Sequence, residues 1–196
     1  MRVSILVFPG VEELDFVGFL EPLVVANRVV GRRWFATELV GTSKGPIECS
    51  GGVMVVPERI VSEPGRQDLI FVPGGGASRG RGVDLAAKDE RVLRLLRSAE
   101  RRGEYVWSVC TGALILGSAG LLKGKRAVTH HGFLDQLRGH GAKVARARTV
   151  TDGKITTGGG ISSSIDVGLE LVRQALGEKT AREVRKRMEY HPPRGS

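Results

Sequence analysis

The chain has 196 residues, of which 41% are hydrophobic and 26% charged, and its formal net charge is +9. These values fit one globular domain with its own core, and the sequence contains no apolar run of about 18 residues that could span a membrane. Two cysteines and four histidines, widely scattered, predict neither a zinc site nor a disulfide. The apolar start stops at Pro9-Gly10 and acidic residues follow, which predicts a first strand, no secretion signal and a cytoplasmic location.

The basic residues are spread along the chain and interleaved with aspartates and glutamates. Such a distribution favours a solvated surface over a nucleic-acid-binding face. Aromatic residues make up only 5% of the chain, too few for platforms on which bases stack. We therefore expect neither a nucleic acid nor a membrane as partner.

Short apolar runs, bounded by glycine, proline or charged residues, predict buried strands of a mostly parallel sheet. These runs cover residues 3–8, 35–40, 53–56, 69–72 and 105–109, with a shorter strand at 126–129 and a hairpin of 149–151 and 154–156. Helical periodicity falls between them, at residues 20–30 (with Pro22 in the first turn), 92–99 (closed by Gly103), 113–122, 161–176 and 179–190. The alternation predicts a doubly wound α/β domain over 1–190 and a flexible tail over 191–196.

In such a sheet, ligands bind beyond the carboxyl ends of the strands, where residues 9–15, 73–76 and 110–112 are expected. Cys110 stands where an apolar strand runs directly into small residues and a helix. The amino end of that helix favours a thiolate, so the position predicts a nucleophile with a lowered pKa. The alternative is a buried structural cysteine.

Three further groups are expected at the same edge. The backbone amides of Gly75, in a glycine-rich loop with Gly74, and of Thr111 are placed to stabilise developing negative charge, although the loop also reads as a plain turn. Asp15 is expected to reach the Cys110 sulfur if their strands are neighbours, and the alternative role for it is a helix N-cap.

Two adjacent histidines, His130 and His131, follow the short strand. Either histidine is a candidate base for Cys110, although structural histidines are more frequent. The segment 158–166 predicts a glycine turn that leads into a serine-capped helix at the pocket floor or at an interface.

Taken together, these residues resemble the DJ-1/PfpI superfamily, and more closely its isonitrile hydratase branch. The similar stretches run in order along nearly the whole chain. They are Phe8-Pro9 with Glu13 to Asp15, Phe71 to Gly75, Ser108 to Ala113, Leu116-Gly117 with residues 119–126, Thr129-His130, and Thr156 to Ile161 with Ile165-Asp166.

The resemblance implies a flavodoxin-like three-layer sandwich of the class I glutamine amidotransferase type, a homodimer, and neither metal nor organic cofactor. Cys110 matches the family nucleophile, Asp15 its acidic partner, and the amides of Gly75 and Thr111 the oxyanion-type site. Thr111 replaces the histidine that follows the cysteine in the protease-like branch, which disfavours a peptidase.

Two positions depart from the hydratase pattern. Phe19 stands where that branch has a proline, and His131 where it has an aromatic residue after Thr129-His130. We expect Phe19 and His130 to touch the substrate. Similar domains also form the ligand-sensing halves of AraC-type regulators, whose downstream helix-turn-helix region has no room in this chain.

The resemblance implies an enzyme for a small-molecule substrate. The Cys110 thiolate would attack an isocyanide, and the thioimidate would be hydrolysed to an N-substituted formamide. Two alternatives remain open: a glutathione-independent glyoxalase or deglycase, and a non-enzymatic redox or ligand sensor based on Cys110.

Overall fold

A central sheet of seven strands organises the computed structural model, which describes residues 1–63, 65–76 and 81–191. The strand order is β10-β11-β7-β6-β1-β2-β5, and all neighbouring strands are parallel except the β10–β11 pair. The strands are β1 (Arg2–Val7), β2 (Ala36–Gly41), β5 (Arg59–Ile60), β6 (Leu69–Val72), β7 (Tyr105–Ser108), β10 (Thr149–Asp152) and β11 (Ile155–Gly158). The predicted mostly parallel α/β sheet is confirmed. Apart from His191, the predicted tail lies outside the described residues.

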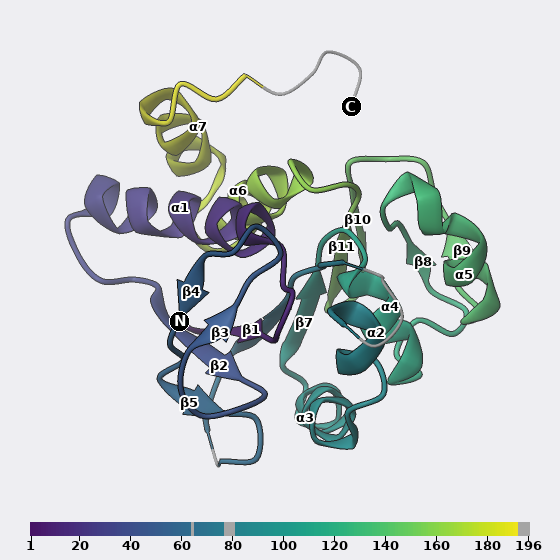
Figure 1. Ribbon diagram of the computed structural model, residues 1–196. Coiled ribbons are helices and arrows are strands. Elements are labelled where there is room, and N and C mark those ends of the chain that lie inside the picture. The colour runs from purple at the N-terminus through teal and green to yellow at the C-terminus, as the bar shows by residue number, and fades with distance from the viewer. Residues whose placement is uncertain (64, 77–80, 192–196) are drawn as a thin grey trace.

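Helices cover both faces of this sheet and complete a three-layer, flavodoxin-like sandwich (Figure 1). On one face α1 (Glu13–Val30), α6 (Ser163–Leu176) and α7 (Glu178–Arg187) pack against one another. On the other lie α2 (Val83–Ala86), α3 (Glu90–Arg101) and α4 (Gly112–Ser118). No helix of the described residues is long and apolar enough to cross a membrane.

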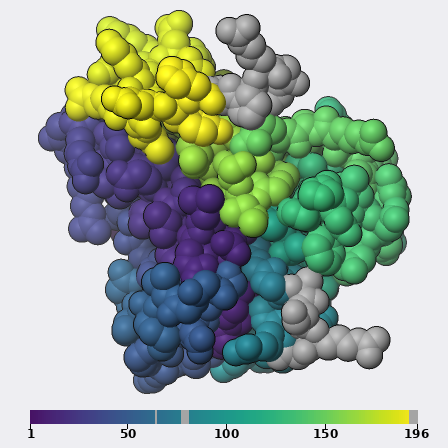
Figure 2. All heavy atoms as spheres, turned by 45° about the horizontal axis from the view of Figure 1, so that its top comes forward, coloured from purple at the N-terminus to yellow at the C-terminus, as the bar shows by residue number. Residues whose placement is uncertain are grey.

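A small lobe stands beside the β10–β11 end of the sheet, seen in green in Figures 1 and 2. It contains β8 (Arg126–Ala127), the 3-10 turn His131–Phe133, α5 (Leu134–Gly139) and β9 (Lys143–Val144). The strands β8 and β9 pair only with each other, so the strand predicted at 126–129 is shorter and lies outside the main sheet.

The core lies between the sheet and its two helical layers. All four residues of β6 are buried, as expected for a central strand whose faces are both covered. Phe19 of α1 stacks on Phe71 of β6, with ring centroids 3.7 Å apart. Phe19 is 0% exposed and packs in the core, so its contact with a substrate stays a prediction.

The helix α1 begins at Glu13, seven residues before the predicted start at residue 20, and Pro22 lies in its interior. The proline lacks a donor for the preceding turn, but its ring packs at the crossing with α6. A methyl group on Gly168 would lie only 2.9 Å from the Pro22 side chain and 2.6 Å from the Phe19 carbonyl. The close crossing of α1 and α6 therefore keeps the helix continuous through the proline.

The predicted central strand at 53–56 is wrong. In its place, β4 (Met54–Val55) pairs antiparallel with β3 (Ile47–Glu48) in a separate hairpin, and Met54 is 56% exposed. The sheet edge is occupied by β5, whose Arg59 pairs with Glu38 at 2.6 Å. A short apolar run does not reveal whether it is covered on both faces, and this one is not.

Candidate active site

The sharp turn predicted at Cys110 is present between β7 and α4. Cys110 has a φ of 54°, a left-handed conformation that is uncommon outside glycine. Its backbone N–H donates to the Gly159 carbonyl at 2.7 Å, and its carbonyl accepts from Thr129 Oγ1 at 2.7 Å. These bonds fix the backbone of a residue that is only 6% exposed. Such strain, held by its surroundings, is typical of functional positions.

Two positions around this turn require glycine, because neighbouring atoms lie too close to leave room for a side chain. A methyl group on Gly112 would lie 2.2 Å from the Val72 carbonyl. One on Gly74 would lie 2.7 Å from Thr111 Oγ1 and 2.8 Å from Asp15 Oδ2. The loop after β6 therefore touches both the turn at Cys110 and the first turn of α1.

The Asp15 side chain reaches this point although its strand is not adjacent to that of Cys110. The strand β6 lies between β1 and β7, and the first turn of α1 carries Asp15 to the end of β6. There Oδ2 accepts the backbone N–H of Gly74 at 2.7 Å, whereas Oδ1 has no hydrogen-bond partner among the described residues. Asp15 is 0% exposed, so one carboxyl oxygen is both buried and unpaired.

Burial dominates the protonation of Asp15. It raises the pKa of the carboxyl from 3.8 to about 7, and the negative charge of Glu12 adds to the effect. The hydrogen bond from Gly74 and the nearby Cys110 thiol oppose the shift only in part. Asp15 therefore exchanges a proton near neutral pH, as a catalytic acid or base must.

The Cys110 thiol departs from the expected low pKa. Burial, followed by the charge of Asp15, raises its pKa from 9.0 to about 12, while the backbone and side chain of Thr111 lower it to a smaller extent. Loss of water around the sulfur thus outweighs the favourable contacts at the start of α4, a helix of only 7 residues. Burial and the Asp15 carboxylate therefore both favour the thiol over the thiolate.

Only one of the two predicted oxyanion amides faces the sulfur. The Thr111 backbone N–H interacts with Cys110. The Gly75 N–H instead donates to Thr111 Oγ1 at 3.1 Å, while the Thr111 hydroxyl lies 3.1 Å from the Gly75 carbonyl. In this structure Gly75 therefore holds the Thr111 side chain in place.

The predicted histidine base does not meet the nucleophile. His130 Nδ1 accepts the backbone N–H of Gly132 at 3.2 Å, and its ring lies 4.2 Å from that of His131. Burial and the neighbouring His131 lower the pKa of His130. No hydrogen bond joins His130 to Cys110 within the described residues. The contact comes from Thr129, which sequence reasoning missed because a hydroxyl that bonds a main-chain carbonyl leaves no distinctive motif.

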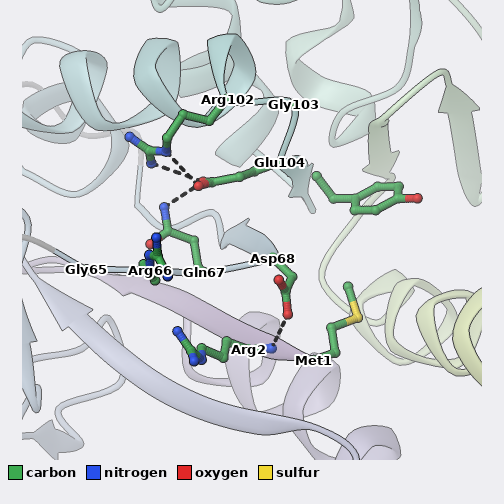
Figure 3. Close-up of a pocket in the computed structure, with 10 residues that line it drawn as sticks. Met1, Arg2, Gly65, Arg66, Gln67, Asp68, Arg102, Gly103 and Glu104 are labelled. Atoms are coloured by element: carbon green, nitrogen blue, oxygen red, sulfur yellow. Dashed lines mark hydrogen bonds and ion pairs between the residues drawn. The ribbon is translucent and has the colours of Figure 1, made fainter.

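A hollow lies at the opposite edge of the sheet, where the strands begin (Figure 3). It encloses about 860 Å³ and includes Tyr105, the first residue of the strand that leads to Cys110. Inside it the Glu104 carboxylate accepts from Arg102 at 2.7 Å and from Gln67 at 2.8 Å (Figure 3). These three side chains bind one another, and none of the described residues that line the hollow is a cysteine, serine or histidine.

Comparison with known proteins gives consistent similarities over almost the whole chain. The model of the DJ-1/PfpI family matches residues 1–174. The isonitrile hydratase of Pseudomonas putida is 38% identical over 192 residues, which cover 98% of this chain and 79% of that protein. The transcriptional regulator CdhR of Pseudomonas aeruginosa is 31% identical over 91% of this chain, but that region is only 52% of the regulator.

Solved structures show the same architecture. A ThiJ/PfpI family protein from Pseudomonas syringae superimposes with a TM-score of 0.87 and 31% identity, covering 100% of this chain and 77% of that one. DJ-1beta from Drosophila melanogaster gives a TM-score of 0.85 at 21% identity, covering 97% of this chain and 98% of that one, a likeness of fold alone.

Proposed function

The chain belongs to the DJ-1/PfpI family, and we propose that it is a cysteine-dependent enzyme that adds water to an isocyanide to give an N-substituted formamide. The observation that carries this proposal is the pair formed by Cys110 and Asp15, a buried carboxyl with a pKa of about 7 and one unpaired oxygen. Similarity to the isonitrile hydratase of Pseudomonas putida supports the choice of reaction.

The active form of the pair carries one proton, shared between sulfur and carboxylate. Burial raises the pKa of both groups, and the Asp15 charge raises that of the thiol further, which favours this proton on Cys110. A thiolate beside a protonated Asp15 has the same proton count, so both descriptions belong to one ionisation state. Below pH 7 Asp15 is protonated while Cys110 keeps its proton. The pair then carries two protons, and the thiol has no base to accept its own.

The first half of the reaction forms a covalent intermediate. As the sulfur bonds to the terminal carbon of the isocyanide, the thiol proton passes to Asp15 and from there to that same carbon. The product is a thioimidate on Cys110, and the Asp15 carboxylate is regenerated. The Thr111 amide stabilises negative charge on the sulfur while its proton is in transit.

The second half releases the formamide. Water adds to the thioimidate carbon while Asp15 takes one of its protons and delivers it to the nitrogen. The remaining hydroxyl proton then passes through Asp15 to sulfur as the carbon–sulfur bond breaks. The formamide leaves, and Cys110 returns as a thiol, so all atoms and protons balance.

The same features disfavour peroxide sensing. Sensor cysteines are accessible and have a low pKa, because the thiolate is the species that is oxidised. Cys110 is 6% exposed and its pKa is raised. Mild peroxide is therefore expected to add oxygen to Cys110 no faster than to Cys49, which is also buried, as peptide mass spectrometry will show.

Turnover of cyclohexyl isocyanide by purified protein tests the proposal. We expect N-cyclohexylformamide to form with the wild type and with Cys49→Ala, and not with Cys110→Ala. Folded wild-type protein that leaves the isocyanide intact contradicts the proposal. If that protein consumes methylglyoxal without glutathione and in a Cys110-dependent manner, the glyoxalase alternative replaces it.

A further inference from the structure

A second cavity, of about 410 Å³, lies between the lobe that carries α5 and the start of α6. Thr129 and Gly159 line it, and these two residues hold the carbonyl and the amide of Cys110. Cys110 and Asp15 do not line it. The cavity therefore adjoins the backbone of the nucleophile without including the reacting side chains.

The walls of this cavity combine apolar surface with positive charge. Its apolar lining comes from Val128, Leu134, Ala145 and Ala147. Among the described residues that line it there is no aspartate or glutamate, whereas Arg146 and Arg148 are present together with His131. A volume of this size with a few polar groups on an apolar wall is typical of small-molecule sites.

The two arginines are not equivalent. The Arg148 guanidinium already forms an ion pair with Asp166 at 2.6 Å, so its charge is balanced within the protein. Arg146 is exposed and makes neither an ion pair nor a hydrogen bond with any described residue. One guanidinium at the cavity is thus available to a ligand, and a guanidinium is well suited to a carboxylate.

We propose that this cavity binds a small organic anion, a carboxylate on a compact apolar body, with the carboxylate on Arg146 and the apolar body against Val128 and Leu134. The isocyanide group itself is neutral, so the proposed reaction needs no pairing with Arg146. The cavity lining also omits Cys110 and Asp15, so the site does not depend on the proposed reaction.

Two main-chain hydrogen bonds connect the proposed ligand site to the backbone of the nucleophile. The Arg148 carbonyl accepts the Gly159 N–H at 2.9 Å, and the Gly159 carbonyl accepts the Cys110 N–H at 2.7 Å. A bound anion thus rests against the same main chain that keeps Cys110 at its positive φ.

Calorimetric titration with benzoate and its neutral counterpart benzamide tests the proposal. We expect saturable one-to-one binding of benzoate, with benzamide at least about tenfold weaker, because the charge-assisted pair with Arg146 is lost. Arg146→Gln should weaken benzoate by a similar factor and leave benzamide unchanged. The variant is safe for folding, since Arg146 is exposed and without a partner among the described residues.

Two controls locate the binding. Arg66→Gln removes another exposed arginine without a described partner, which lines the hollow of Figure 3 at the opposite edge, and Cys110→Ala removes the thiol. Both should bind benzoate as the wild type does. The proposal is overturned if the wild type shows no saturable binding, if benzoate and benzamide bind equally, if Arg146→Gln has no effect, or if either control loses benzoate.

Discussion

The two edges of the sheet are built from the same strands, β1, β6 and β7, and differ in how their polar groups are paired. At the amino edge, a hollow of about 860 Å³ contains Glu104, whose carboxylate receives both Arg102 and Gln67. At the carboxyl edge, Asp15 keeps an unpaired buried oxygen and Cys110 a positive φ. The strained cysteine and the titratable buried carboxyl, and not the size of a hollow, mark the chemistry.

Replacing the carboxylates at the two edges should give the largest contrast. We expect Asp15→Asn to lower isocyanide turnover by about 10²–10⁴-fold, the usual contribution of a positioned acid or base. Glu104→Gln, at the other edge, should leave turnover within about twofold because it lies far from the reacting atoms. Steady-state rates of formamide formation measure both variants. Equal losses would mean that the carboxyl edge has no special role.

The same Asp15→Asn variant should be more stable than the wild type at high pH. The folded-state pKa of Asp15 is about 7 against 3.8 for the free side chain, so the folded protein loses stability as pH rises between these values. Asparagine avoids this loss, which amounts to about 4 kcal/mol at pH 8 and vanishes below pH 3.8. Urea unfolding of the wild type and the variant, at pH 8 and below pH 3.8, tests this prediction. If their free energies of unfolding differ by the same amount at both pH values, Asp15 is not a buried titrating group.

Neighbouring glycines offer a matched pair within one loop. Gly74→Ala would place a methyl group 2.7 Å from Thr111 Oγ1 and is expected to cost about 1–3 kcal/mol of stability, with a loss of turnover. A methyl group on Gly76 meets no described residue within 4 Å, so Gly76→Ala should stay within about 0.5 kcal/mol of the wild type. Thermal unfolding compares the two, and similar costs would exclude tight packing as the reason for Gly74.

The smallest effect is expected at the amino edge. Gln67 is 5% exposed, and its Oε1 has no hydrogen-bond partner among the described residues. Gln67→Leu removes that unpaired group together with one bond to Glu104, so the two changes nearly cancel and stability should shift by less than about 1 kcal/mol. Turnover should not change. A large loss of turnover would give the amino edge a functional role.

Much of the fold follows from local patterns, because β1, β6 and β7 are short, mostly apolar runs, and β1 and β6 are followed closely by Pro9 and Pro73. The start of α1 and the hairpin at β4 do not follow from local patterns. Whether a helix continues through Pro22, and whether a short apolar run becomes a central strand, depends on the segments that pack against them. The turn at Cys110 can be predicted, because an apolar strand runs directly into small residues there.

Other parts of the site depend on tertiary contacts. The sequence could suggest that Asp15 meets Cys110 only if their strands were adjacent, whereas the structure joins them across β6 through Gly74. The raised pKa of Cys110 also escapes sequence reasoning, because burial of the sulfur depends on all the segments around it. The contact from Thr129 is of the same kind.

The pH dependence of kcat/KM for cyclohexyl isocyanide tests most directly whether Asp15 serves Cys110 as its proton acceptor. Because the active pair carries one proton and the pKa of Asp15 is about 7, the wild-type value should rise through pH 7 and then level off. Asp15→Asn should lack this rise while keeping a low residual rate. A wild-type profile that is flat or falls across pH 7, or the same rise in Asp15→Asn, would contradict the account.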